Sequence, residues 1–281
     1  MGHSVVVLTH DSEKTIRRCL DALLSQTYKD FELIIIDDCS TDKTRDILDS
    51  YEDKRIRIFL NQIQFGIAKS RNRGLRESKE KLIFFTDSDC IPSKRWLELG
   101  IKSIKNNDIV TGTTFYEKQN PTFKHRVIYS RDHFVTCNLG FKRKEIEEVN
   151  GFDEEEFNMY SEDKDLCFRI LKNKGKKVFC PEMIVVHQEV FKTPKRELNT
   201  YKHYLCNKLK LQVKYGKEQS IFKRIIRPDM LLCTVFPFAI LIVEQFKGFR
   251  DLKILPFTWL GMLIGRIMMW KKCIELRKFY I

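Results

Sequence analysis

Residues 82–90 read LIFFTDSDC, an apolar run that ends abruptly in two acids. Such a run is typical of a strand that is buried on both faces of a sheet. Because a buried strand cannot carry charge, Asp87 and Asp89 are expected just beyond its carboxyl end. Two carboxylates in this position can hold a hard divalent cation, since such ions prefer oxygen ligands.

Upstream of this stretch, apolar runs recur at 5–8, 31–36 and 56–60 and predict three earlier strands. The second of these runs also ends in acids, Asp37 and Asp38. Strands that alternate with helices form a mostly parallel sheet covered by helices. Because ligands of such sheets bind at the carboxyl ends of the strands, both acidic pairs are expected in one cleft.

Helical patterns fill the gaps between the predicted strands. A helix with inward-facing Ile16 follows the first strand, and Asp11 or Ser12 is expected to cap it. Asp42 is expected to cap the next helix. Residues 66–75 read as a loop that leads into a third helix.

The second half of the predicted domain is less regular. Residues 109–112 favour a strand, and a helix is expected to begin at a Ser161 cap and to end at Gly175. Residues 178–180 and 183–186 favour two further strands. The expected fold class is therefore α/β for this part of the chain.

Positive charge is concentrated in one stretch. The formal net charge is +13, and residues 192–227 alone hold eleven Lys and Arg against two Glu, net +9. Within them Tyr201, Leu205, Leu209 and Val213 recur at helical spacing, which predicts a basic amphipathic helix. An anionic partner is expected: nucleic acid, acidic lipid headgroups or a phosphorylated substrate.

Two apolar segments follow, at 230–243 and 254–270. As a helix the first would be about 21 Å long, shorter than the roughly 30 Å hydrocarbon core of a bilayer. Lysines and arginines between the segments would lie on the wrong side of a membrane hairpin. We therefore favour helices in the membrane interface, or a shallow re-entrant hairpin, over two transmembrane spans. A helical pair docked on the catalytic domain is the other alternative.

The cysteines indicate a reducing compartment. Nine are scattered along the chain without a CxxC pair, which is typical of buried thiols and not of a disulfide framework. The first apolar run is too short for a secretory signal, because His10 and Asp11 follow it at once. We expect the bulk of the protein in the cytoplasm.

Three further groups of residues are candidates for chemistry. Asp38 has a carboxylate that can accept a hydrogen bond from a nucleotide base such as uracil, although helix capping explains this acid equally well. Arg71 can contact phosphate. His187 follows a strand-like run and becomes a metal ligand if it lies beside Asp89.

Glu162 and Asp163 open a predicted helix, with Asp165 close behind. The helix dipole stabilises an ionised carboxylate there, and such a group can act as general base towards a hydroxyl. The alternative is that these acids only complement the dipole, and Arg169 is spaced to pair with Asp165.

Taken together, the motifs resemble family-2 glycosyltransferases of the GT-A fold, over residues 4–189. The matching segments, in the family's order, are SVVVLTHDSE (4–13), DFELIIIDDCSTDKT (30–44), GIAKSRNRGL (66–75), FFTDSDCIP (84–92), CNLGFKRKEIEEVNGFDEE (137–155), SEDKDLCFRILKNKGKKV (161–178) and VVH (185–187).

The resemblance implies roles for individual residues. Asp163, beside Glu162, would be the general base of an inverting, single-displacement reaction. Asp89 and His187, with Asp87 near the ribose or metal, would bind Mn²⁺ or Mg²⁺. The implied donor-binding residues are Leu8, Thr9, His10, Asp38, Arg71, Asp87 and Ser88.

One departure from the family is the first turn. The usual Pro-Thr-Tyr-Asn is LTHD here, so His10 stands where an aromatic ring would stack on the base. A second is that no QxxRW motif is present, so a non-processive enzyme is expected.

The resemblance therefore implies a glycosyltransferase that uses a nucleotide-diphosphate sugar, UDP- or GDP-linked. Residues 1–190 would form its GT-A catalytic domain, 191–228 a basic helical region and 229–281 membrane-associating helices. The basic tail favours a lipid-linked or glycan acceptor at the cytoplasmic membrane face, with peripheral or monotopic attachment. A catalytically silent nucleotide-sugar-binding module is the alternative. Nucleic-acid binding is not expected, because no such motif accompanies the charge.

Overall fold

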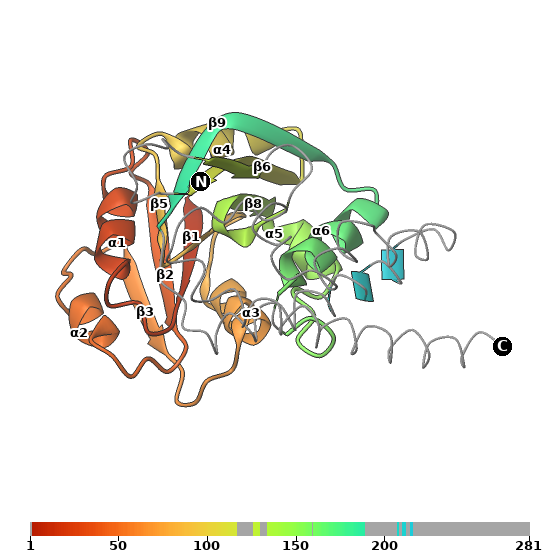
Figure 1. Cartoon of the computed structure of the whole chain (residues 1–281). Coiled ribbons are helices and arrows are strands. Elements are labelled where there is room, and N and C mark those ends of the chain that lie inside the picture. Colours follow the sequence, from red (N-terminus) through yellow and green to blue (C-terminus); the bar gives the residue numbers. More distant parts are fainter. Residues whose placement is uncertain are drawn as a thin grey trace, which may run out of the picture. The chain divides into compact units, whose positions relative to one another are not determined.

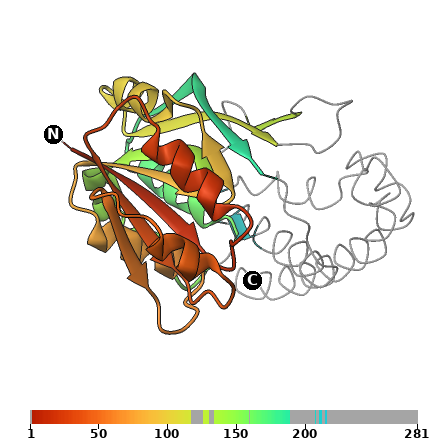
Figure 2. The same ribbon diagram turned by 90° about the vertical axis from the view of Figure 1, so that its left-hand side faces the viewer.

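The computed structural model describes residues 2–116, 126–129, 134–158 and 160–188, together with residues 207, 210, 211, 214 and 215. The chain divides into two units, Met1–Val190 and Phe191–Ile281. All helices and strands given below belong to the first unit (Figures 1 and 2). The predicted apolar helices at 230–243 and 254–270 lie outside the described residues, as do Tyr201, Leu205, Leu209 and Val213 of the predicted basic helix. No helix in the described part is long and apolar enough to cross a bilayer.

The first half of the sheet is parallel. Its spatial order is β3-β2-β1-β4, and the strands span His3–Thr9 (β1), Phe31–Asp37 (β2), Ile56–Leu60 (β3) and Leu82–Asp87 (β4). The four strand predictions made from the apolar runs are confirmed, and β3 coincides with its predicted range.

Helices cover both faces of this half-sheet, as Figure 1 shows. Because side chains alternate along a strand, Val5 and Val7 face one layer and Val6 faces the other. The first layer contains α1 (Ile16–Leu24), α2 (Thr44–Asp49) and α4 (Trp96–Ile104). The second contains α3 (Ile67–Glu77), α5 (Arg143–Glu148) and α6 (Glu162–Lys172). β1, β2 and β4 are therefore buried on both sides, whereas the edge strand β3 is only partly buried.

Beyond β4 the sheet is mixed, so the prediction of a mostly parallel sheet is wrong there. The remaining order is β8-β6-β9-β5, and β7 pairs with β6. β8 joins β4 and β6 antiparallel, β5 joins β9 antiparallel, and β6 with β9 is parallel. The bounds are Cys90–Pro92 (β5), Ile109–Tyr116 (β6), Arg126–Tyr129 (β7), Leu139–Lys142 (β8), Lys177–His187 (β9) and Thr136–Asn138 for a 3₁₀ turn, η1.

β9 unites the two strands that were predicted at 178–180 and 183–186. Its register on β6 shifts between Gly112 and Thr113, where Cys180 and Ile184 are the successive partners. Pro181 lies in this irregularity, at a position where its missing N–H costs no ladder hydrogen bond. The gap between the two predicted strands is therefore a bulge within one strand and not a break between two.

Two predicted helix caps are wrong, and the third is confirmed only in part, since Lys43 is the cap residue of α2. The helix after β1 begins after Thr15, and Ser12 contributes its backbone carbonyl, not its side chain. Ser161 does precede α6, but it has a left-handed backbone and makes no side-chain cap bond. Asp42 lies one position before that cap, and its Oδ1 accepts the N–H of the first helical residue, Thr44, at 2.9 Å.

Candidate active site

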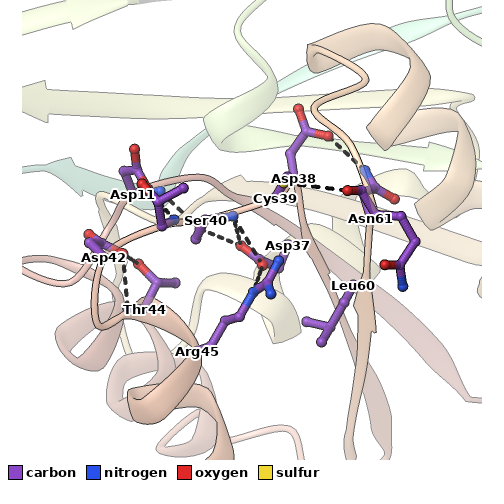
Figure 3. A network of polar contacts seen from close by, with 12 residues as sticks. Asp11, Asp37, Asp38, Cys39, Ser40, Asp42, Thr44, Arg45, Leu60 and Asn61 are labelled. Atoms are coloured by element: carbon purple, nitrogen blue, oxygen red, sulfur yellow. Dashed lines mark hydrogen bonds and ion pairs between the residues drawn. The ribbon is translucent and has the colours of Figure 1, made fainter.

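Asp37, at the end of β2, is fully buried and bonded to its own turn. Its carboxylate accepts hydrogen bonds from the Ser40 N–H at 3.3 Å and from the Ser40 hydroxyl. Arg45 reaches back from α2 and donates its Nε–H to Asp37 at 2.8 Å (Figure 3). These donors hold the turn between β2 and α2 in one shape, so Asp37 acts as a structural residue.

Asp38 points the other way, towards β3 and α3 (Figure 3). Its Oδ1 accepts hydrogen bonds from the Asn61 amide at 2.7 Å, the Ser70 hydroxyl at 2.9 Å and the Phe65 N–H at 2.9 Å. Its Oδ2 accepts one, from the Gly66 N–H at 2.9 Å. A carboxylate oxygen has room for two acceptor bonds, so the capacity that remains for a base is on Oδ2.

The predicted nucleotide turn, residues 8–11, lies beside the β2 turn. Asp11 has a left-handed backbone (φ 47°), and its Oδ1 accepts the Thr41 N–H at 2.8 Å. Thr9 is buried, and its hydroxyl has no hydrogen-bond partner among the described residues. Leu8 is half-buried, whereas His10 is exposed, with its Nε2 3.5 Å from Asp11 Oδ2. The Thr9 hydroxyl is therefore available to bond a ligand, and the exposed His10 ring is available to contact it.

Asp89 and His187, which are 98 positions apart by their numbering, meet through strand pairing. β5 begins directly after Asp89, and its first residue, Cys90, is the register partner of His187. As a result, His187 Nε2 lies 3.5 Å from Asp89 Oδ1. The Gln188 N–H also bonds the Asp89 carbonyl at 2.7 Å, which fixes the two chain segments together.

The His187 ring is oriented as in a metal ligand. Its Nδ1 lies 3.0 Å from the Gln188 carbonyl, which can only accept a hydrogen bond, so Nδ1 carries the proton. In the neutral ring the lone pair is then on Nε2, facing Asp89. Gln188 is itself held by Arg18, whose Nη1 donates to its amide oxygen at 3.0 Å. A carboxylate is a ligand that suits Mn²⁺ or Mg²⁺, and an oriented imidazole is a ligand for transition metals, so the pair fits Mn²⁺ better than Mg²⁺.

The surroundings of Asp89 lack full charge compensation. Burial raises the pKa of Asp89, and the charge of a protonated His187 ring only partly opposes this. Asp87, two residues earlier, adds like-charge repulsion in the same direction. Between them, Ser88 is buried and its hydroxyl lies 2.8 Å from that of Ser12. A bound cation would relieve the repulsion between Asp87 and Asp89.

Arg71 connects the turn after β4 to the start of α6. It is buried on α3, its Nη2 lies 3.1 Å from Asp87 Oδ1, and its Nη1 forms an ion pair with Glu162. Sequence reasoning placed Arg71 on phosphate, whereas the structure places its guanidinium between two carboxylates. Contact with phosphate therefore stays a prediction.

Glu162 and Asp163 are buried at the first turn of α6. Burial raises the pKa of Glu162 to about 7 and also raises that of Asp163. The helix N-terminus alone would favour the charged forms, but desolvation outweighs the contacts that favour them. Asp163 Oδ2 accepts the Thr136 N–H at 3.3 Å. The predicted pairing of Asp165 with Arg169 is confirmed at 2.7 Å.

Sequence reasoning missed Cys90, Cys137 and Gln188. Asp89, Cys90 and His187 form one group with potential ligand atoms within 4.8 Å of one another, and Asp87, Cys90 and Cys137 form a second. Adjacency to Asp89 was a signal for Cys90, and adjacency to His187 was one for Gln188. Cys137 had none, because it reaches the site through the turn η1.

Comparison with known proteins gives two family matches. A model described as glycosyl transferase family 2 matches residues 4–160, and one described as the N-terminal domain of galactosyltransferase matches residues 121–204.

Two similar relatives match about half of the chain or less. Glycosyltransferase AglE of Haloferax volcanii is 30% identical over 167 residues, which are 53% of this chain and 55% of that protein. WfgD of Escherichia coli, a UDP-Glc:α-D-GlcNAc-diphosphoundecaprenol β-1,3-glucosyltransferase, is 34% identical over 106 residues, 38% and 42% of the two chains. The chain thus spans about half the length of these relatives.

A similar solved structure is the mannosyltransferase PcManGT from Pyrobaculum calidifontis in complex with GDP-Man and Mn²⁺. Its TM-score is 0.63 at 18% identity, and the match covers 96% of this chain and 86% of that one. This likeness shows the fold, a mixed α/β sheet typical of GT-A glycosyltransferases. Because the first family match spans more than half of its residues, the chain belongs to glycosyl transferase family 2.

Proposed function

We propose that the chain transfers one sugar from a UDP- or GDP-linked donor to an acceptor, non-processively and with inversion at the anomeric carbon. The observation that carries the proposal is the 3.5 Å approach of His187 Nε2 to Asp89 Oδ1, with Nδ1 of the same ring 3.0 Å from the Gln188 carbonyl. Asp89 and His187, with Asp87 nearby, would hold Mn²⁺ or Mg²⁺, which when bound neutralises charge on the leaving diphosphate.

The nucleotide would lie against the turns after β1 and β2. Thr9 offers a buried hydroxyl without a described partner, and Asp38 Oδ2 has acceptor capacity for a base N–H. His10 is exposed and does not pack in the core, so its ring can stack on a base. Ser88 and Leu8 complete the proposed donor edge.

Asp163 is the proposed general base. In a single displacement it takes the proton of the acceptor hydroxyl while that oxygen bonds to the anomeric carbon. The bond from this carbon to the leaving phosphate oxygen breaks on the opposite face. Burial raises the pKa of Asp163, and a base whose pKa lies nearer the working pH transfers protons more effectively. Glu162 and Arg71 hold this segment against Asp87.

The proposed acceptor is a lipid-linked or cell-envelope glycan at the cytoplasmic face of a membrane. The relative WfgD is named for its diphosphoundecaprenol-linked acceptor. The net charge of +9 in residues 192–227 suits binding to anionic lipid. Salt-sensitive binding to anionic liposomes but not to DNA is the expected result, and preference for DNA would contradict the membrane proposal.

The donor proposal is tested by thermal stabilisation of the full chain with a panel of UDP-, GDP- and other nucleotide sugars, each with Mn²⁺ and with chelator. A ligand that binds the native state raises stability by RT ln(1 + [L]/Kd). We expect a metal-dependent shift with one nucleotide class. The absence of any shift, with liposomes present as well as without them, would contradict donor binding.

A further inference from the structure

Cys90 places a thiol within ligand distance of the proposed cation site. It follows Asp89 directly and is the register partner of His187, so the strand pairing of β5 and β9 sets the positions of all three residues. Its side chain is fully buried, whereas those of Asp89 and His187 are 30% and 22% exposed. The thiol therefore lies on the inner side of the pair, with the carboxylate and the imidazole nearer the surface.

Two of the three separations between the ligand atoms match those of a tetrahedral zinc site. Zinc bonds of about 2.0 Å to oxygen and nitrogen and about 2.3 Å to sulfur place neighbouring ligand atoms roughly 3.3–3.6 Å apart. Asp89 Oδ1 lies 3.5 Å from His187 Nε2 and 3.6 Å from Cys90 Sγ. All three ligand atoms lie within 4.8 Å of one another. Only small side-chain movements are needed to bring them onto one ion.

We propose that Asp89, Cys90 and His187 form a site for a borderline-soft divalent cation, Zn²⁺ in the first instance, and that Zn²⁺ bound there displaces Mn²⁺ or Mg²⁺. When Zn²⁺ binds, the Cys90 thiol gives its proton to solvent and the thiolate bonds the ion. Thiolate ligands select zinc over hard cations, and zinc also exceeds manganese in general affinity order. The consequence that Zn²⁺ inhibits transfer rests on the proposed function, whereas zinc binding itself does not.

A second group shares Cys90 and gives the proposal its main rival. Asp87 and Cys137 also have ligand atoms within 4.8 Å of the Cys90 thiol. An ion held there would need Cys137 and would not need His187. The variants Cys137→Ser and His187→Ala therefore distinguish the two arrangements.

The test uses Co²⁺ as an optical substitute for Zn²⁺ on the full chain, without donor or acceptor. Bonding of a thiolate to Co²⁺ produces an intense near-ultraviolet charge-transfer absorption, which added Zn²⁺ removes by displacement. We expect this absorption in the wild type, its loss in Cys90→Ser and His187→Ala, and its retention in Cys137→Ser. Cys39→Ser is the matched control, because this more exposed thiol contacts the Gln62 carbonyl instead.

Zinc affinity, obtained from the displacement titration, should fall more than about 100-fold in Cys90→Ser, because loss of even an outer partner costs about 10- to 100-fold. The wild-type spectrum needs no variant, so misfolding of Cys90→Ser does not remove the test. No charge-transfer absorption in the wild type would overturn the proposal, as would an absorption that depends on Cys137 or Cys39. Because donor and acceptor are absent, neither result bears on sugar transfer.

Discussion

Two pairs of aspartates stand at the carboxyl ends of parallel strands, and their surroundings differ. Asp37 and Asp38, after β2, accept hydrogen bonds from the hydroxyl, amide, backbone and arginine donors of their own turn and its neighbours. Asp87 and Asp89, after β4, have mainly one arginine and one histidine. The protein supplies hydrogen-bond donors for the carboxylates of the first pair, whereas it leaves the charge of the second pair partly uncompensated.

The acids around Arg71 extend this contrast. Glu162 and Asp163 are buried with Asp87 near one guanidinium, and burial raises the pKa of both. Uncompensated buried acids are costly, and they gather where a protein uses them. Similar sequence motifs therefore have different purposes: the Asp37 cluster builds the turn, and the Asp87–Asp89 cluster is suited to a cation and a reacting group.

The largest expected effect is that of Asp163→Asn. We expect transfer to fall about 10²- to 10⁴-fold, because a general base is lost, while the thermal shift produced by the nucleotide sugar is retained. Asp165→Asn is the matched control, since Asp165 pairs with Arg169 and is expected to affect stability. Unimpaired transfer by Asp163→Asn would refute its role.

Asp89→Ala should abolish metal-dependent donor binding and lower transfer about 10²- to 10³-fold, the range for loss of one charge-stabilising group. The free energy of unfolding should not fall, because the variant removes an acid that burial disfavours. Calorimetric titration of donor with Mn²⁺, repeated with chelator, measures the first effect. Equal donor affinity in the wild type and in Asp89→Ala would contradict the distinction between the Asp87–Asp89 cluster and the Asp37 cluster.

The pH dependence of stability should reveal Glu162. Its folded pKa is raised to about 7 from an ordinary value of 4.5, so the folded state holds this proton more tightly than the unfolded state. The stability that protonated Glu162 contributes is present below about pH 4.5. As pH rises through 7, the free energy of unfolding loses this contribution, about 3 kcal/mol. The free energy of unfolding, measured with urea across this pH window, should therefore decline less in Glu162→Gln than in the wild type. Parallel profiles would contradict this prediction.

The smallest effect is expected at the satisfied cluster. Asp37→Asn should lower the free energy of unfolding by about 1–3 kcal/mol, because Arg45 and Ser40 lose a charged acceptor. Mn²⁺ affinity should stay at the wild-type level. Chemical denaturation and metal titration of the same preparation check both statements. A large loss of Mn²⁺ affinity without loss of stability would reverse the two assignments.

Sequence reasoning succeeded where structure is local. The strands at 5–8, 31–36 and 56–60 were predicted because each is a short apolar run with its own helix after it. Pairing beyond β4 is long-range: β8 lies between β4 and β6, although β5 and β6 come earlier in the chain. No local pattern specifies such an insertion, so the mixed half-sheet was missed.

The same distinction holds in the site. Asp89 and His187 were selected by motif, and the structure brings them together. Arg71 lies between Asp87 and Glu162, and Glu162 is 91 positions away from it in the sequence. Composition and motif spacing do not predict a contact over such a separation. The rise in the pKa of Glu162 depends on burial, which becomes known only when α6 is packed.

Paramagnetic resonance of Mn²⁺ tests the central claim most directly, namely that the Asp87–Asp89 cluster is a cation site and the Asp37 cluster is not. Free and bound Mn²⁺ would be measured with wild type, Asp89→Ala and Asp37→Asn, each with and without the nucleotide sugar selected by the stabilisation panel. We predict bound Mn²⁺ that increases with nucleotide sugar in wild type and Asp37→Asn and disappears in Asp89→Ala. Equal binding by Asp89→Ala and wild type would contradict the account.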